Sequence, residues 1–168
     1  VTEKLTAVPH CNGTDYWVIA HKAGSNEFAA FQVSAGGVAS SPRISAVGSR
    51  HAAGVESAGH LKASPSGGRL AAAIFGQNAL ELFDFNNATG EVGNFVRLTS
   101  PATTRAYGLE FSPSGKWLYL SGGYNESLTT GVKTIYQLDA TSTTAAALGA
   151  SVQAIGQSPA GSVGALQL

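Results

Sequence analysis

Ser64-Pro65-Ser66-Gly67 and Ser112-Pro113-Ser114-Gly115 are two copies of one turn motif. Proline presets the backbone angle φ at the second position of a tight turn, and glycine closes the turn without a steric penalty. In both copies a short apolar segment precedes the turn and another follows it. The motif therefore predicts a β-hairpin that occurs twice in the chain.

The repeat extends well beyond the two turns. Each copy contains a segment before the turn, a segment after it and a later alternating segment with aromatic residues, always in the same order. The matching pairs of segments are 60–63 and 108–111, 69–73 and 117–120, and 80–85 and 134–139. Alternation with a period of two predicts β-strands whose two faces differ.

A weaker third copy lies upstream. Asn12-Gly13 takes the place of the turn, Tyr16–Ile19 forms the segment after it, and Phe28–Val33 corresponds to the alternating segment. Units of about 50 residues that consist of short strands are typical of propeller blades. Four strands in each unit would complete such a blade.

The sequence therefore predicts an all-β fold, a β-propeller of four-stranded antiparallel blades with three blades and the first strand of a fourth. The blades are expected at about residues 4–51, 52–105 and 106–160, and the fourth is expected to begin at 161–168. Propellers usually close with about 4–8 blades. We therefore expect a partial propeller, whose open faces are covered by remaining blades of the same protein or by another protein chain.

The composition of one segment favours two different kinds of secondary structure. The alanine-rich stretch 144–150 has helix propensity, but threonines lead into it and Gly149 interrupts it. We expect a loop there.

Composition excludes several classes of protein. Ten Lys and Arg residues balance ten Asp and Glu residues, and only 12% of residues are charged, so a general nucleic-acid binder is excluded. A hydrophobic content of 43% can build a core, which argues against charge-driven disorder. No apolar run reaches the roughly 20 residues that span a bilayer. The single cysteine, Cys11, excludes an internal disulfide and is expected to be buried.

Potential catalytic and metal-binding residues are few. His10, Cys11, Asp15 and His21 are close in sequence, but their spacing matches no common metal motif, so we expect no metal and no cofactor. A Gly-x-Ser-x-Gly nucleophile motif is absent from the sequence. We assign no catalytic residue and expect no enzymatic activity.

A ligand site is expected in the loop that is enlarged in the third unit. Tyr124, Asn125 and Glu126 lie there, and loops carry binding residues more often than framework strands do. The ligand would be a glycan or a peptide. Trp17 and Trp117, by contrast, occupy second-strand positions and are expected to pack between blades.

The chain also resembles a known family. Lys4-Leu5-Thr6-Ala7-Val8 and the segment 10–21 are similar to the opening blade of WD-repeat-like propellers in large bacterial surface proteins, which the type IX secretion system exports. The later segments that carry the resemblance are 61–65, 80–86, 107–113, 135–139 and 164–168. Ser66 and Ser114 depart from the family, which usually has an acidic residue in the turn, and the sorting domain of those proteins is absent from this sequence.

The resemblance implies a non-enzymatic, structural or binding propeller module of a secreted, cell-surface bacterial protein with an adhesin-like role. Two alternatives remain open. One is a propeller that binds sugar or peptide through its loop face. The other is a propeller hydrolase or lactonase, which would need metal at His10 or His21, or activity that depends on His21.

Overall fold

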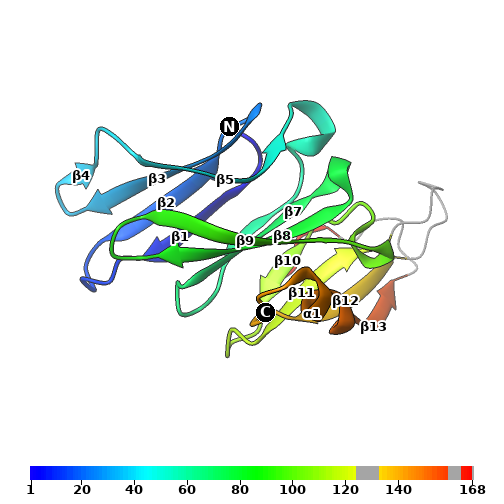
Figure 1. The fold of residues 1–168 in the computed structure, drawn as a ribbon. Coiled ribbons are helices and arrows are strands. Elements are labelled where there is room, and N and C mark those ends of the chain that lie inside the picture. The colour runs from blue at the N-terminus through cyan, green and yellow to red at the C-terminus, as the bar shows by residue number, and fades with distance from the viewer. Residues whose placement is uncertain (124–132, 159–163, 168) are drawn as a thin grey trace.

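In the computed structural model, which describes residues 1–123, 133–158 and 164–167, the chain forms three antiparallel sheets of four main strands each. Figure 1 shows the sheets beside one another in chain order, blue to cyan, then green, then yellow to red. The predicted all-β architecture with four-stranded antiparallel units is confirmed.

The sheets are named in chain order. Sheet 1 contains β1 (Leu5–Pro9), β2 (Tyr16–His21), β3 (Ser25–Ser34) and β5 (Arg43–His51), with the two-residue β4 (Gly37–Val38) paired to β3. Sheet 2 contains β6 (Leu61–Ala63), β7 (Arg69–Ile74), β8 (Ala79–Asn86) and β9 (Glu91–Thr99). Sheet 3 contains β10 (Leu109–Phe111), β11 (Trp117–Gly122), β12 (Lys133–Asp139) and β13 (Gln153–Ser158).

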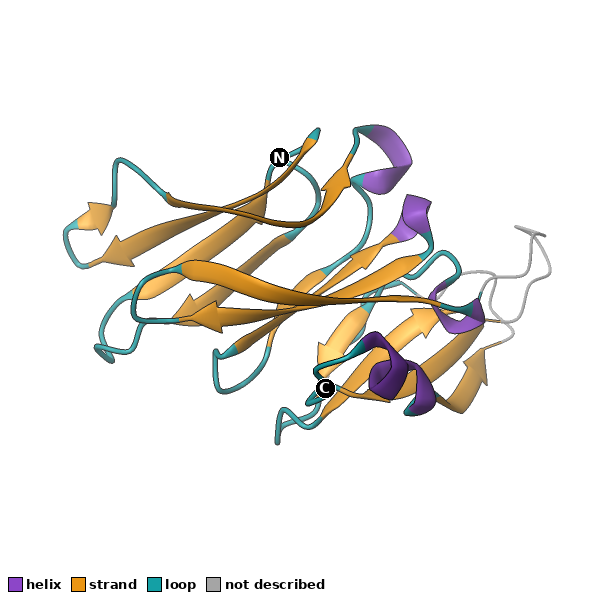
Figure 2. Cartoon of the chain, in the orientation of Figure 1, coloured by secondary structure: helices purple, strands orange, loops and turns teal. Residues whose placement is uncertain are grey.

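The two ends of the sheets differ in character. Figure 2 shows the short 3₁₀ helices η1 (Gly54–Glu56), η2 (Phe75–Gln77) and η3 (Pro101–Thr103) at the end where β6 and β10 begin. We call this the loop end. The hairpin turns between the first and second strands of each sheet lie at the opposite end, which we call the turn end.

The repeated turn has the same hydrogen bonds in both copies. Gly67 N donates to Ser64 O, and Gly115 N donates to Ser112 O, each over 2.8 Å. The hydroxyls of Ser64 and Ser112 accept from the amides of Arg69 and of Trp117, each over 3.1 Å. Both glycines have positive φ, which glycine adopts without a steric penalty, so the predicted turn forms in both copies.

The alanine-rich segment is a helix, and the loop predicted there is wrong. α1 (Ala145–Ala150) begins at Thr144, whose side-chain oxygen accepts a 3.2 Å hydrogen bond from Ala147 N. Leu148 is fully buried in the core shared with sheets 2 and 3. A helix of this length is marginal alone, so the N-cap and the burial of Leu148 stabilise it.

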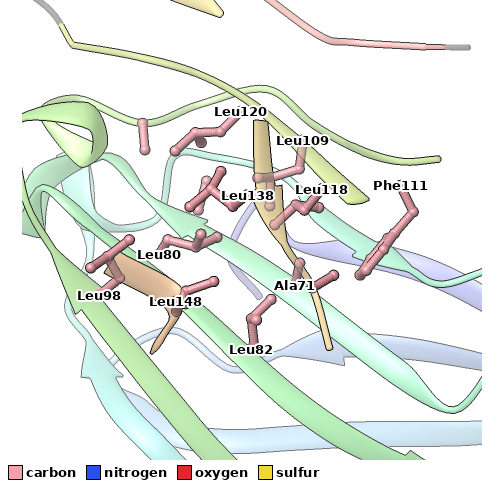
Figure 3. Packing of buried hydrophobic residues seen from close by; sticks show 13 residues of the cluster. Ala71, Leu80, Leu82, Leu98, Leu109, Phe111, Leu118, Leu120, Leu138 and Leu148 are labelled. Atoms are coloured by element: carbon pink, nitrogen blue, oxygen red, sulfur yellow. The ribbon is translucent and has the colours of Figure 1, made fainter. Parts of the chain in front are cut away.

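Apolar side chains fill the spaces between the sheets. Figure 3 shows the cluster between sheets 2 and 3, in which Leu80 and Leu82 meet Leu118 and Leu138. A second cluster between sheets 1 and 2 centres on Phe28 and the residues around it. These two clusters hold the three sheets in one body.

Trp17 packs between sheets 1 and 2, as predicted. It is 6% exposed, and its Nε1 donates a 2.9 Å hydrogen bond to Asn87 O. A Cβ on Gly90 would lie 2.7 Å from the indole ring. Trp117, in contrast, is only partly buried, with the Lys116 ammonium 4.6 Å from its ring centroid.

The outermost faces of sheets 1 and 3 carry uncovered apolar groups. On sheet 1, Leu5 is 61% exposed and Ile44 is 43% exposed. On sheet 3, a cavity of about 200 Å³ is lined by Tyr119, Ile135 and Ile155, among others. Residues 164–167 have no regular strand structure, although Ser121 Oγ donates to Gly164 O over 3.4 Å.

Within the described residues, no helix has the length and apolar character that crossing a membrane requires.

Candidate functional site

The structure places the residues considered from the sequence in different locations. Tyr124, Asn125 and Glu126 lie outside the described residues. Cys11 is exposed at the turn end, so the prediction that it is buried is wrong. It projects from a hairpin turn beside His10, whereas His21 ends β2 at the loop end. The described part of the chain contains no group of three or more His, Cys, Asp or Glu residues that could hold a metal ion.

The loop end brings residues from all three sheets together. Glu3 precedes β1, His60 precedes β6 and Tyr107 precedes β10. Backbone hydrogen bonds join the neighbouring sheets there, from Glu3 N to Ser57 O over 3.1 Å and from His60 N to Tyr107 O over 3.0 Å. Three residues that are far apart in sequence therefore share one surface.

The side chains of these residues interact directly. Glu3 Oε2 accepts a 3.2 Å hydrogen bond from Gly59 N. Burial, followed by the nearby negative charge of Glu3, raises the pKa of Tyr107. The ring of His60 lies 5.2 Å from that of Tyr107. Carboxylate, phenol and imidazole are thus within reach of one small molecule.

The pKa of the His60 imidazole is lowered from its ordinary value, first by burial and then by the positive charge of Lys62. The buried Nδ1 has no hydrogen-bond partner within the described residues. Lys62 itself forms a 2.8 Å ion pair with Glu110. This ion pair links β6 to β10 two residues after His60.

A cavity of about 170 Å³ lies at the same end, among the segments that connect β5 to β6, β7 to β8 and β9 to β10. Its walls are Val55, Phe75, Gly76, Asn78 and Arg105. The Arg105 guanidinium carbon lies 5.5 Å from the centroid of the Phe75 ring. A cation beside an aromatic ring suits the binding of an anionic or planar group.

The backbone of this cavity is strained. Asn78 has φ of 52° and Arg105 has φ of 49°, in the left-handed region that side chains rarely adopt. Arg105 N donates a 2.8 Å hydrogen bond to Asn78 Oδ1, which holds the two loops together. Strain of this kind persists where surrounding contacts enforce it, and it is frequent at ligand sites.

Lys4 fixes one wall of the cavity. Its fully buried ammonium donates to the carbonyls of Ser57 and Ala58 over 3.2 and 3.1 Å, and more weakly to Glu56. Burial lowers the pKa of Lys4 to about 8, against the opposing negative charges of Glu3 and Glu81. These hydrogen bonds hold in place the loop that carries Val55.

A second polar cluster is closed to solvent. His21, His51 and Glu81 are all 0% exposed in the interface between sheets 1 and 2. Glu81 binds Arg97 over 2.7 Å and accepts from the Ser49 hydroxyl. Because no substrate can reach these groups, His21 has a structural role in this interface, which leaves the alternative of catalysis at His21 without support.

Sequence reasoning missed Arg105, Phe75 and Asn78 as site residues. Their only sequence signal is their position in the loops between predicted strands, and every unit has such loops. The positive φ of Asn78 and Arg105 is visible only in the structure.

Comparisons with known proteins find similarity at the level of fold. No family model and no curated protein sequence matches the chain. A candidate 6-phosphogluconolactonase from Bacteroides uniformis superposes with a TM-score of 0.54 at 14% identity, covering 94% of this chain and 41% of that one.

Two further solved structures are similar. A candidate 6-phosphogluconolactonase from Bacteroides fragilis has a TM-score of 0.50 at 16% identity, covering 89% of this chain and 37% of that one. A protein from Lactobacillus plantarum has a TM-score of 0.52 at 18% identity, covering 90% and 40% respectively. This chain therefore has a β-propeller-like fold and spans about two-fifths of the length of the proteins it matches.

Proposed function

We propose that the chain forms three consecutive blades of a larger β-propeller, which binds and hydrolyses the lactone of an anionic sugar acid at the loop end. The observation that carries this proposal is the strained pair Asn78 and Arg105 in the wall of a cavity at the end of the molecule that also carries Glu3, His60 and Tyr107. The fold similarity to two candidate 6-phosphogluconolactonases supports the choice of reaction.

The chemistry of lactone hydrolysis matches the groups at this end. Water adds to the lactone carbonyl carbon, the bond from that carbon to the ring oxygen breaks, and the ring oxygen leaves as a hydroxyl after taking up a proton. The Glu3 carboxylate would accept the proton of the attacking water. The Tyr107 hydroxyl would donate a hydrogen bond to the carbonyl oxygen as negative charge develops on it. Arg105 would bind the anionic group of the substrate.

Further blades are the proposed partners of this chain. The uncovered apolar groups Leu5 and Ile44 on sheet 1, and Ile135 and Ile155 on sheet 3, support this arrangement, because monomeric proteins rarely leave such faces open. The larger size of the similar structures also supports it. The secreted, adhesin-like role implied by the family resemblance stays a prediction.

Proton release by the protein that carries this chain tests the function. With 6-phosphogluconolactone as substrate, we expect hydrolysis above the uncatalysed rate, because each turnover converts an ester to a carboxylate and a proton. Arg105→Gly removes the guanidinium and relieves the strained backbone, so it should raise KM at least tenfold without loss of folding. Arg43→Ala, which removes an exposed arginine from sheet 1, is the matched control and should have no effect.

Two results would contradict hydrolysis by this surface. A rate equal to the uncatalysed one, together with no binding of 6-phosphogluconate by calorimetry, would refute lactone hydrolysis. Binding without turnover would instead favour a non-enzymatic binding role for the same surface.

A further inference from the structure

The turn between β1 and β2 contains Asn12-Gly13, a pair that occurs only once in the sequence. Residues 11–14 are exposed at the turn end. Apart from the chain neighbours of Gly13, no atom lies within 4 Å of the position that a Cβ would take there. Water and hydroxide therefore reach this pair from solvent. The turn shares no residue with the cavity around Arg105.

An asparagine side chain that is followed by glycine can react with its own backbone. Hydroxide removes the proton of Gly13 N, and this nitrogen attacks the side-chain carbonyl carbon Cγ of Asn12, with no Cβ on the glycine to hinder the approach. The bond from Gly13 N to Cγ closes a cyclic imide. The bond from Cγ to Nδ2 breaks, and Nδ2 takes a proton from water and leaves as ammonia. Water then opens the imide at one of its two carbonyls, which gives aspartate or isoaspartate.

The turn already binds the oxygen on which negative charge develops in this reaction. Asn12 Oδ1 accepts hydrogen bonds from Thr14 N over 3.1 Å and from Asp15 N over 3.0 Å. Both donors stabilise the oxygen more strongly once Gly13 N has added to Cγ, because the oxygen is then negatively charged. Gly13 N itself donates a 3.0 Å hydrogen bond to His10 O, and this bond must open before hydroxide takes the proton.

A second turn at the same end provides an internal comparison. Asn86 is exposed, and its Oδ1 accepts from Ala88 N over 3.0 Å and from Thr89 N over 3.3 Å. The side chains of Asn12 and Asn86 therefore bind the same two backbone positions, the second and third residues after each asparagine. The two turns differ in the residue that supplies the attacking nitrogen, which is glycine after Asn12 and asparagine after Asn86.

We propose that Asn12 is a site of self-modification, at which the folded protein converts a neutral amide to a carboxylate and releases ammonia. Water is the co-reactant, and no enzyme is required. Both products add a negative charge to the turn end, and isoaspartate also lengthens the backbone of the turn by a methylene group.

The modification acts on the contact between sheets 1 and 2 at the turn end. Cys11 N donates a 3.2 Å hydrogen bond to Asn87 O, which also accepts from Trp17 Nε1. A longer backbone in the turn moves Cys11 relative to this carbonyl. The new carboxylate also repels that of Asp15, whose backbone amide binds the same side chain. We therefore expect the modified protein to unfold at a lower urea concentration than the fresh protein.

Peptide mapping of the aged protein tests the proposal. The folded protein is incubated in buffer at pH 8.5 and 37 °C and is then digested with trypsin, which cleaves after Lys4 and Lys22. Peptide 5–22 contains Asn12 as its only asparagine and has no glutamine, so a mass gain of about 1 Da in this peptide identifies the conversion. We expect Asn12 to convert at least tenfold faster than Asn86, because glycine leaves the attacking nitrogen open.

Two variants separate the role of the glycine from that of the turn. Asn87→Gly places a glycine after Asn86 and keeps the backbone carbonyl at position 87, so Asn86 should convert at least tenfold faster than in the parent protein. Gly13→Ala should slow the conversion of Asn12 at least tenfold, because a Cβ then hinders the attacking nitrogen. Urea denaturation of each variant before incubation shows that the compared proteins are folded.

Two results would overturn the proposal. They are a peptide 5–22 that keeps its mass throughout the incubation, and equal conversion of Asn12 in the parent protein and in folded Gly13→Ala. A protein without lactonase activity that still converts Asn12 would leave this inference intact, because the turn and the loop end are at opposite ends of the sheets.

Discussion

The imidazole ring of His21 lies nearly parallel to that of His51 in the interface between sheets 1 and 2, with ring centroids 3.8 Å apart. Both side chains are fully buried. None of their ring nitrogens has a hydrogen-bond partner within the described residues, although His51 Nε2 lies 3.9 Å from Glu81 Oε2. A proton on His21 would place a positive charge in this buried interface, so the stability of the interface should depend on pH.

Acid is therefore expected to destabilise the protein. Burial, followed by the nearby charges of His51 and Lys4, lowers the pKa of His21 from 6.5 to about 3. In the unfolded chain His21 takes up its proton near pH 6.5, so the free energy of unfolding should fall as the pH drops from about 6.5 toward 3. The slope is at most about 1.4 kcal/mol per pH unit for one group.

Urea denaturation from pH 8 to pH 4 measures this dependence. His21→Phe, which keeps an apolar ring in the interface, should make the slope between pH 6.5 and 4.5 shallower. His10→Gln, which changes a histidine at the turn end, should leave the slope unchanged. Equal free energies of unfolding of the parent protein at pH 6.5 and 4.5 would contradict the predicted effect of His21 protonation.

Glu81 should be the most costly carboxylate to neutralise. Burial alone would raise its pKa, but the nearby His51 ring and hydrogen bonds from Ser49 and Arg97 outweigh burial and lower the pKa to about 2. Its stabilising contribution is therefore present above pH 4.5 and is lost as the pH falls toward 2. Glu81→Gln leaves Arg97 without its carboxylate and should lower the free energy of unfolding by about 3–5 kcal/mol.

The exposed pair of Arg43 and Glu91 provides the control for Glu81. These side chains are 3.2 Å apart, and each is about half exposed. Glu91→Gln should change the free energy of unfolding by less than about 1 kcal/mol. Equal effects of Glu81→Gln and Glu91→Gln in urea denaturation would contradict a special role for the buried carboxylate.

Gly90 is expected to tolerate no side chain, for two separate reasons. Its φ is 73°, and a Cβ would lie 2.7 Å from the Trp17 ring. Gly13→Ala, at φ of 75° with no atom within 4 Å of its Cβ, measures the backbone strain alone, about 1–2 kcal/mol. Gly90→Ala should cost clearly more than Gly13→Ala in urea denaturation and should change the fluorescence of Trp17. Equal losses of unfolding free energy in the two variants would mean that the Trp17 ring moves away from position 90 without an energetic cost.

Local sequence patterns determined much of the fold. Ser64-Pro65-Ser66-Gly67 and its second copy form the same turn because proline and glycine set backbone angles without help from distant residues. The segment 80–85 becomes β8, whose two faces lie in different cores, with Leu80 and Leu82 in one and Phe83 and Phe85 in the other. The helix at 145–150 was missed because its stability comes from the burial of Leu148, which no local pattern reports.

The candidate site at the loop end depends on the tertiary structure. Arg105 meets Phe75 and Asn78 because loops from different sheets converge at one end. Sequence alone determined the strands and turns of this protein, since these follow from backbone preferences and a period of two. Which polar side chains meet was decided only by the packing of sheet against sheet, because contacts between distant residues depend on register, bulges and loop paths.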